Sequence, residues 1–171
     1  PRRRVQRTVV RRAAVISVEI DHRQRDAVLL TLAPPGIEPV EPGIAWPVYG
    51  HDPEGTRFGN GISLAPPFKT AWTFRARTLV EFPPAVAYGR LYFANAKGIL
   101  FAVETKRVRT EWAYRAHRCT AASPAVDNHT VYMTFMNKPP CNATRSGLDG
   151  EVVAINADTG RPIVSFGDAG R

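Results

Sequence analysis

The sequence predicts an all-β fold, because short runs of aromatic and β-branched residues recur in it at a fixed distance. The pentapeptide WTFRA at residues 72–76 is followed by Pro-Ala-Val at 84–86, and both recur 40 residues later as WAYRA at 112–116 and Pro-Ala-Val at 124–126. A repeat of this length, built from short strands, is typical of a β-propeller, whose blades stack to bury one another's faces. The sequence therefore predicts propeller blades.

A second correspondence, at a shift of 52 residues, pairs GILFAV at 98–103 with GEVVAI at 150–155. The second copy is therefore 12 residues longer, and the extra residues belong to a turn-rich segment, 136–149, that we expect to form a loop at a hairpin tip. The same shift pairs Trp112 with Val164, which predicts an outer strand in the second copy as well.

Each copy contains a predicted hairpin of two short central strands. Residues 90–94 pair with 98–103 in the first copy, and 130–135 pair with 151–155 in the second. The repeat itself begins with an expected strand at 70–74. Because a closed propeller needs roughly 4 to 8 blades, we expect an incomplete propeller of about two four-stranded antiparallel blades. Such a fragment would have the remaining blades as its partners.

Residues 1–33 are predicted to be a basic and partly apolar N-terminal tail. Residues 1–26 hold eight arginines against three acidic residues and so account for +5 of the net charge of +8. The apolar runs 13–18 and 27–33 are each shorter than the ~20 residues that a membrane-spanning helix needs. Two interpretations stay open: a poorly ordered tail with a strand or short helix in it, or a degenerate signal-anchor. Nucleic-acid binding is less favoured, because the repeat region is only mildly basic.

Residues 34–43 contain four prolines, and a fifth follows at Pro47. Proline fixes φ and removes backbone donors, so we expect an extended linker here and not part of a sheet. The propeller blades are predicted to occupy residues 44–171.

The segment after the linker carries a recognisable pattern. Residues 46–58 read W-x-x-Y-G-x-D-x-x-G-T-R-F, with a turn expected at residues 52–55, and a Trp-x-Phe strand follows at 72–74. This pattern resembles the opening of pyrroloquinoline quinone (PQQ)-dependent dehydrogenases and of PQQ-like repeat propellers. The resemblance implies a propeller fold over residues 46–166.

The ends of the blades extend the resemblance to the family motif A-x-D-x-x-T-G-K-x-x-W. The second copy matches it from Ala154 but has Asn156 for Asp and Val164 for Trp, and the first copy has Arg107-Val108 for Thr-Gly. The resemblance implies that the Ala and Trp positions pack between blades and that Thr-Gly makes the turn. The expected blade-packing residues are Trp72, Trp112, Ala102, Ala154, Thr159 and Gly160.

The chain has two cysteines, at 119 and 141. Cys119 precedes the innermost strand of the second blade, and Cys141 lies in the insertion at the same end of that sheet, about two strand spacings or ~10 Å away. The insertion can fold back over that gap, so we expect a Cys119 to Cys141 disulfide and, with it, an extracytoplasmic protein, periplasmic or at the cell surface. Two free buried thiols are the alternative.

No arrangement of residues in the sequence predicts catalysis. The four histidines have no metal-ligand spacing, and no position matches the PQQ-stacking, calcium-binding or catalytic-base residues of the dehydrogenases. We therefore assign no catalytic, cofactor or metal residue in this chain.

Two classes of function remain. The first is a non-enzymatic PQQ-like propeller module of an exported or membrane-anchored protein, which binds partner proteins and acts as a scaffold. The second is the N-terminal part of a PQQ- and calcium-dependent quinoprotein dehydrogenase that oxidises alcohols or sugars. Fold alone does not decide between them.

Overall fold

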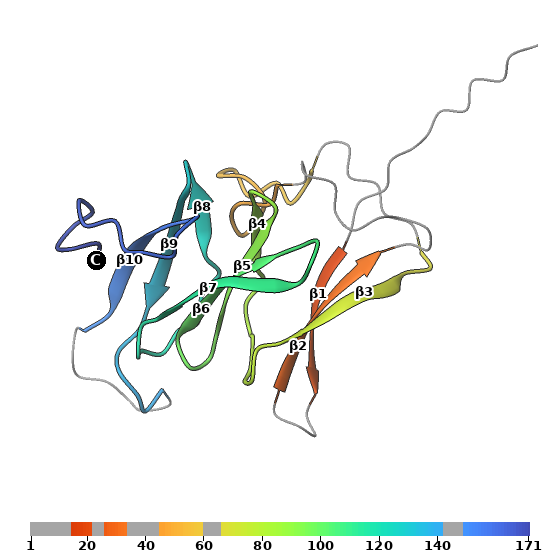
Figure 1. The fold of residues 1–171 in the computed structure, drawn as a ribbon, viewed down its shortest axis with the longest axis horizontal. Coiled ribbons are helices and arrows are strands. Elements are labelled where there is room, and N and C mark those ends of the chain that lie inside the picture. The colour runs from red at the N-terminus through yellow and green to blue at the C-terminus, as the bar shows by residue number, and fades with distance from the viewer. Residues whose placement is uncertain (1–14, 22–25, 34–44, 60–65, 142–148) are drawn as a thin grey trace, which may run out of the picture.

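The computed structural model of the chain describes residues 15–21, 26–33, 45–59, 66–141 and 149–171. The regular structure in these residues is β-strand, arranged in three antiparallel sheets that lie side by side (Figure 1). The strands are β1 Val15–Asp21, β2 Asp26–Ala33, β3 Lys69–Arg75, β4 Ala85–Ala87, β5 Arg90–Asn95, β6 Ile99–Glu104, β7 Arg109–Arg115, β8 Ala125–Asp127, β9 Thr130–Phe135 and β10 Glu151–Asn156. The prediction of an all-β fold is confirmed.

The central sheet is a complete four-stranded blade in the order β4-β5-β6-β7. Between β4 and β5 the chain turns through Tyr88 and Gly89, whose φ angles of 51° and 69° are both positive, as a two-residue hairpin requires. The expected hairpin of central strands forms in register, with Tyr92 opposite Ala102. We call this sheet blade 1.

The next sheet, blade 2, has three strands in the order β10-β9-β8. Where its fourth strand was expected, the described chain makes one isolated bridge, between Ile155 and Pro162, and then turns. Proline has no backbone N–H with which to continue a ladder. The turn brings the Gly170 carbonyl back to accept a hydrogen bond from the Ala154 amide at 3.1 Å, and Val164 is left 76% exposed.

The strand with Trp72 does not belong to the same sheet as the hairpin that follows it. This strand, β3, pairs with β2, with Val28 opposite Arg75, so it is the outer strand of a preceding sheet. The two apolar runs of the N-terminal tail thus coincide with two paired strands, β1 and β2. The linker, 34–43, and residues 1–14 and 22–25 of the tail lie outside the described residues, so the predicted domain boundaries there stay predictions.

Two clusters of buried side chains fill the spaces between the sheets. One joins the first sheet to blade 1 and contains Phe93, with Phe74 and Phe101 packed against it. The other joins blade 1 to blade 2, from Tyr92 on one side to Met133 on the other. Full burial of a large apolar side chain stabilises the fold by about 1.5 to 3 kcal/mol, so these clusters hold the sheets together.

The motif at residues 46–58 connects the innermost strands. Trp46 forms an isolated bridge with Val86, and the Pro47 carbonyl accepts a hydrogen bond from the Val126 amide at 2.7 Å. The predicted turn is present. Within it, the side-chain hydroxyl and then the amide of Thr56 hydrogen-bond to the Asp52 carboxylate and lower its pKa to about 2. Among the described residues there is no helix long and apolar enough to cross a bilayer.

Candidate functional site: the boundary between the blades

The boundary between blade 1 and blade 2 is built around Trp112, which lies on β7. Its indole Nε1–H donates a hydrogen bond to the Ala157 carbonyl of blade 2 at 2.8 Å. The Tyr92 hydroxyl donates to the same oxygen at 3.5 Å, and burial raises the pKa of Tyr92 to about 12, so the hydroxyl stays a donor at neutral pH. One backbone carbonyl of blade 2 therefore receives two side-chain donors from blade 1.

Gly160 allows Trp112 to approach the blade 2 turn closely. A Cβ atom added at Gly160 would lie 2.7 Å from the Cδ2 and Cγ atoms of Trp112, and Gly160 has a φ of 70°. Both the space and the backbone conformation thus require glycine. Ala102, which is fully buried, sits opposite Trp112 in the β6-β7 ladder. These contacts place Trp112, Ala102 and Gly160 at the boundary between the blades.

The turn that presents Gly160 is organised by one side chain. The Asn156 Oδ1 atom accepts hydrogen bonds from the Asp158 amide at 3.1 Å, from the Thr159 amide at 2.9 Å and from the Thr159 hydroxyl at 3.0 Å. In blade 1, the Glu104 carboxylate accepts hydrogen bonds from the amides of Lys106 and Arg107 at 3.0 Å each. Asn156 and Glu104, which stand at the Asp position of the family motif, thus both bond to the amides two and three residues further along the chain.

The boundary between the first sheet and blade 1 is also built around a tryptophan on an outer strand, Trp72, but the hydrogen bond from the indole is missing there within the described residues. Trp72 packs against the cluster that also receives Val108, and its buried Nε1 atom has no hydrogen-bond partner in the described residues. Val108 occupies the position that Gly160 has in blade 2, with a φ of 53°. A β-branched residue in the left-handed region is strained, and valine cannot offer the open space that Gly160 gives to Trp112.

A group of ionisable side chains lies at the tips of the hairpins on the boundary between blade 1 and blade 2. Arg90 of blade 1 hydrogen-bonds to Glu111 and, at 2.9 Å, to Asp158 of blade 2. His129 lies 3.1 Å from the other Asp158 oxygen, and its ring stacks on Tyr88 with centroids 4.1 Å apart. The sequence pattern alone did not predict this group. The repeat could have indicated it, because the turn residues Tyr88-Gly89 and Asn128-His129 correspond at the 40-residue shift.

The structure joins Cys119 and Cys141 in a disulfide, with their Cα atoms 5.5 Å apart. The insertion folds back as expected, because the Met136 amide donates to the Cys119 carbonyl at 2.7 Å and the Cys119 amide donates to the Asn137 carbonyl at 2.9 Å. Arg118 adds an ion pair to Glu151 at 3.2 Å. The predicted pairing is confirmed. The remainder of the insertion, 142–148, lies outside the described residues.

Replacing Cys141 with serine is expected to lower the free energy of unfolding by about 3 kcal/mol. The bridge spans 22 residues, and a link of that length restricts the unfolded chain. Cys141 is exposed, so serine there buries no new polar group, whereas Cys119 is fully buried. Urea unfolding with and without reductant measures the effect: the wild-type midpoint should fall on reduction and that of Cys141→Ser should not. A loss below about 1 kcal/mol would contradict a stabilising bridge.

Residues 46–171 match the family described as glucose/ethanol/alcohol dehydrogenase, beta-propeller domain, the PQQ family. The match covers most of the chain. The chain belongs to the PQQ β-propeller family. No curated protein matches it.

Two solved structures of quinoprotein type are similar to this PQQ-family chain. The europium-containing methanol dehydrogenase is 13% identical, with a TM-score of 0.52 over 86% of this chain and 21% of its own. The quinohemoprotein alcohol dehydrogenase ADHIIG of Pseudomonas putida HK5 is 22% identical, with a TM-score of 0.46 over 54% of this chain and 15% of its own. The chain thus spans about a fifth or less of these relatives, and at this identity the likeness concerns the fold.

The calcium-dependent alternative can be examined in the structure. A calcium site needs about six to eight oxygen ligands. Across the part of the chain that the structure describes, no three His, Cys, Asp or Glu side chains are arranged so that they could hold a metal ion. The carboxylates of Asp52, Glu104 and Asp158 are each engaged by neighbouring donors instead. The described residues therefore contain no cluster of acidic side chains that could hold a calcium ion by itself.

Five of the six predicted blade-packing residues lie at the two boundaries between sheets. Trp112, Ala102 and Gly160 meet at the boundary of blades 1 and 2, with Thr159 beside Gly160 in the turn. Trp72 lies at the other boundary. Ala154 is buried within blade 2, where it pairs with Tyr132.

Proposed function

We propose that this chain is part of a non-enzymatic PQQ-type propeller, which acts as a binding and scaffolding module. The group of side chains between the hairpin tips carries this proposal. Arg90, His129 and Asp158 bond to one another or to neighbouring side chains across the blade boundary. Catalytic acids and bases, by contrast, need access to a substrate in a cavity. In this chain the chemistry of these groups serves to hold blades together.

An extracytoplasmic location forms part of the proposal, and the disulfide supports it. Disulfides persist in oxidising compartments, whereas cytosolic thiols are kept reduced. The bridge also anchors the insertion to the loop between the blades. In an exported propeller, such anchored loops would present a stable surface to partner proteins, and the remaining blades would complete the domain.

A second candidate function is favoured by the family match over residues 46–171. The chain would then be the first part of the propeller of a quinoprotein dehydrogenase that oxidises alcohols or sugars. PQQ and calcium would be its cofactors, and residues beyond the described ones would be needed to complete the set of calcium ligands. The two candidates differ in whether calcium-dependent PQQ binding accompanies the propeller.

The chain is expected to show no calcium-dependent PQQ binding and no oxidation of ethanol or glucose. Titration with PQQ, with calcium or with chelator, can be followed by tryptophan fluorescence, and turnover by reduction of an artificial electron acceptor. A quinoprotein alcohol dehydrogenase is the positive control. The scaffolding proposal fails if saturable PQQ binding requires calcium, or if turnover appears.

Peptide mapping without reduction, on protein from its native source, tests the location: two unlinked cysteines would argue against export.

A further inference from the structure

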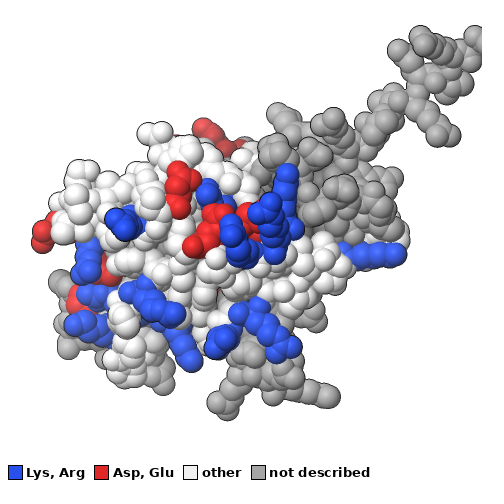
Figure 2. All heavy atoms as spheres, viewed as in Figure 1, with Lys and Arg blue, Asp and Glu red and all other residues white. Residues whose placement is uncertain are grey.

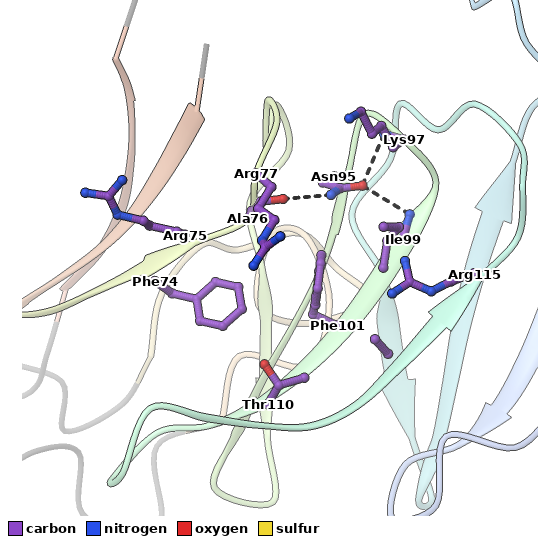
Figure 3. Close-up of a pocket in the computed structure, with 11 residues that line it drawn as sticks. Phe74, Arg75, Ala76, Arg77, Asn95, Lys97, Ile99, Phe101, Thr110 and Arg115 are labelled. Atoms are coloured by element: carbon purple, nitrogen blue, oxygen red, sulfur yellow. Dashed lines mark hydrogen bonds between the residues drawn. The ribbon is translucent and has the colours of Figure 1, made fainter. Parts of the chain in front are cut away.

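A cavity of about 730 Å³ lies between the first sheet and blade 1 (Figure 3). Its walls come from the end of β3 and the residues just after it, and from β6, β7 and the turn between β5 and β6. A volume of this size lies in the range of small-molecule binding sites. The lining residues are Phe74, Arg75, Ala76, Arg77, Asn95, Lys97, Ile99, Phe101, Thr110, Ala113 and Arg115.

The charged side chains that line this cavity are all positive, since four are basic and none is acidic. Three other basic side chains of blade 1 and its connection, Arg90, Arg109 and Arg118, form ion pairs. None of the four cavity cations forms an ion pair with a described residue. Below the centre of the face in Figure 2, Lys and Arg side chains likewise lie together without an intervening acidic group.

Two of the cations converge on an aromatic wall. In Figure 3 the guanidinium groups of Arg77 and Arg115 lie on opposite sides of the Phe101 ring, whereas Arg75 extends away from it. Phe74 meets Phe101 edge to face, with ring centroids 5.6 Å apart. Flat apolar groups pack well on such rings, and guanidinium groups bind carboxylates and phosphates through paired hydrogen bonds.

The wall is held in place by a buried amide. Asn95, 1% exposed, donates from Nδ2 to the Ala76 carbonyl at 2.9 Å, and its Oδ1 accepts from the amides of Lys97 and Ile99 at 3.1 Å each. These bonds tie the segment before Arg77 to the hairpin turn that carries Lys97. The two edges of the cavity are therefore fixed relative to each other before any ligand binds, which lowers the cost of ordering them.

The lining favours binding over catalysis. General acid and base catalysis needs a group that titrates near the working pH. The described lining offers guanidinium and ammonium groups, one amide and one hydroxyl, and it has neither histidine nor carboxylate. Such a set can neutralise negative charge but has no group suited to exchange protons with a substrate.

We propose that this cavity binds a small organic anion with a flat apolar body and two anionic groups. The apolar body would pack on Phe74 and Phe101, and the two anionic groups would pair with Arg77 and Arg115. The volume suits a small molecule, and cations on two sides of the ring favour a dianion. Binding of this ligand is separate from the scaffolding role and needs no calcium.

The test titrates the full chain with 2,6-naphthalenedicarboxylate, a rigid aromatic dianion, in calcium-free buffer by calorimetry. Saturable binding at one site is expected. Arg77→Gln and Arg115→Gln should each weaken it about tenfold, because each removes a charge-assisted hydrogen bond. Arg109→Gln is the matched control: Arg109 lies on the same strand as Arg115, its side chain is 65% exposed, and it does not line the cavity. Arg109→Gln should bind the dicarboxylate with an affinity within about twofold of that of the wild type.

Two further probes test separately whether binding needs the apolar body and whether it needs the negative charges. Inorganic phosphate should bind at least about tenfold more weakly than the dicarboxylate, because it lacks the apolar body. The uncharged dimethyl ester should not bind measurably. Absence of saturable dicarboxylate binding, equal loss in Arg109→Gln, or equal affinity for phosphate would each overturn the proposal. Circular dichroism of the variants checks that all three remain folded.

Discussion

Replacing Gly98 with alanine is expected to lower the free energy of unfolding by about 3 to 5 kcal/mol. Gly98 ends the turn between β5 and β6 with a φ of 68°, and a Cβ atom there would lie 1.9 Å from the Arg118 carbonyl oxygen. Alanine therefore adds strain in the left-handed region and a clash with backbone that cannot rotate away. The affected backbone directly precedes Cys119, so the substitution should also disturb the connection between the blades.

Gly89→Ala is the matched control for this substitution. Gly89 has a φ of 69°, but nothing lies within 4 Å of a Cβ atom added there. Gly89→Ala should therefore lower the free energy of unfolding by only about 1 to 2 kcal/mol, which is the cost of the left-handed backbone conformation itself. Urea unfolding followed by circular dichroism measures both variants. Equal losses would mean that the contact between Gly98 and Arg118 is absent in solution.

Replacing Trp112 with alanine is expected to lower the free energy of unfolding by about 3 to 5 kcal/mol. The indole covers Gly160 of the next blade and donates the hydrogen bond to the Ala157 carbonyl, so truncation leaves a cavity and an acceptor with one donor fewer. Because these contacts join two blades, we also expect less cooperative unfolding. A loss below about 1.5 kcal/mol would show that the blades do not depend on this contact.

Phenylalanine substitutions separate the ring from its hydrogen bond. Trp112→Phe should lower the free energy of unfolding by about 1 to 2 kcal/mol, because it removes the hydrogen-bond donor to the Ala157 carbonyl as well as part of the ring. Trp72→Phe should lose less, because the buried Nε1 atom of Trp72 has no partner and its removal relieves an unfavourable burial. The same urea unfolding experiment decides this, and a larger loss at Trp72 than at Trp112 would contradict the assignment of the two boundaries.

The internal repeat was sufficient to predict the strands and turns of each blade. Pairing of β5 with β6 and of β9 with β10 depends on neighbours along the chain, joined by short turns, so periodicity and turn residues predict it. The disulfide was predictable for a related reason. The order of strands in an antiparallel blade places Cys119 and the insertion with Cys141 at one end of the sheet.

Assignment of strands to sheets required the tertiary structure. A repeat has no marked starting point, so the strand with Trp72 can begin one blade or end the preceding one. Its pairing with β2, across a long segment of sequence, makes it the latter. The short fourth segment of blade 2 is likewise a tertiary outcome, because Gly170 returns to bond to Ala154.

The sequence by itself determined the all-β class, the repeat, the hairpins, the resemblance to the PQQ propellers and the cysteine pair, since each follows from local order along the chain. Only the tertiary structure decided which side chains meet between the sheets. Trp112 meets Gly160 across 48 positions of sequence, and Arg77 and Arg115 flank one ring although they belong to different sheets or their connections. Contacts of that kind depend on the packing of whole blades, because no short-range pattern specifies the distance between residues on separate sheets.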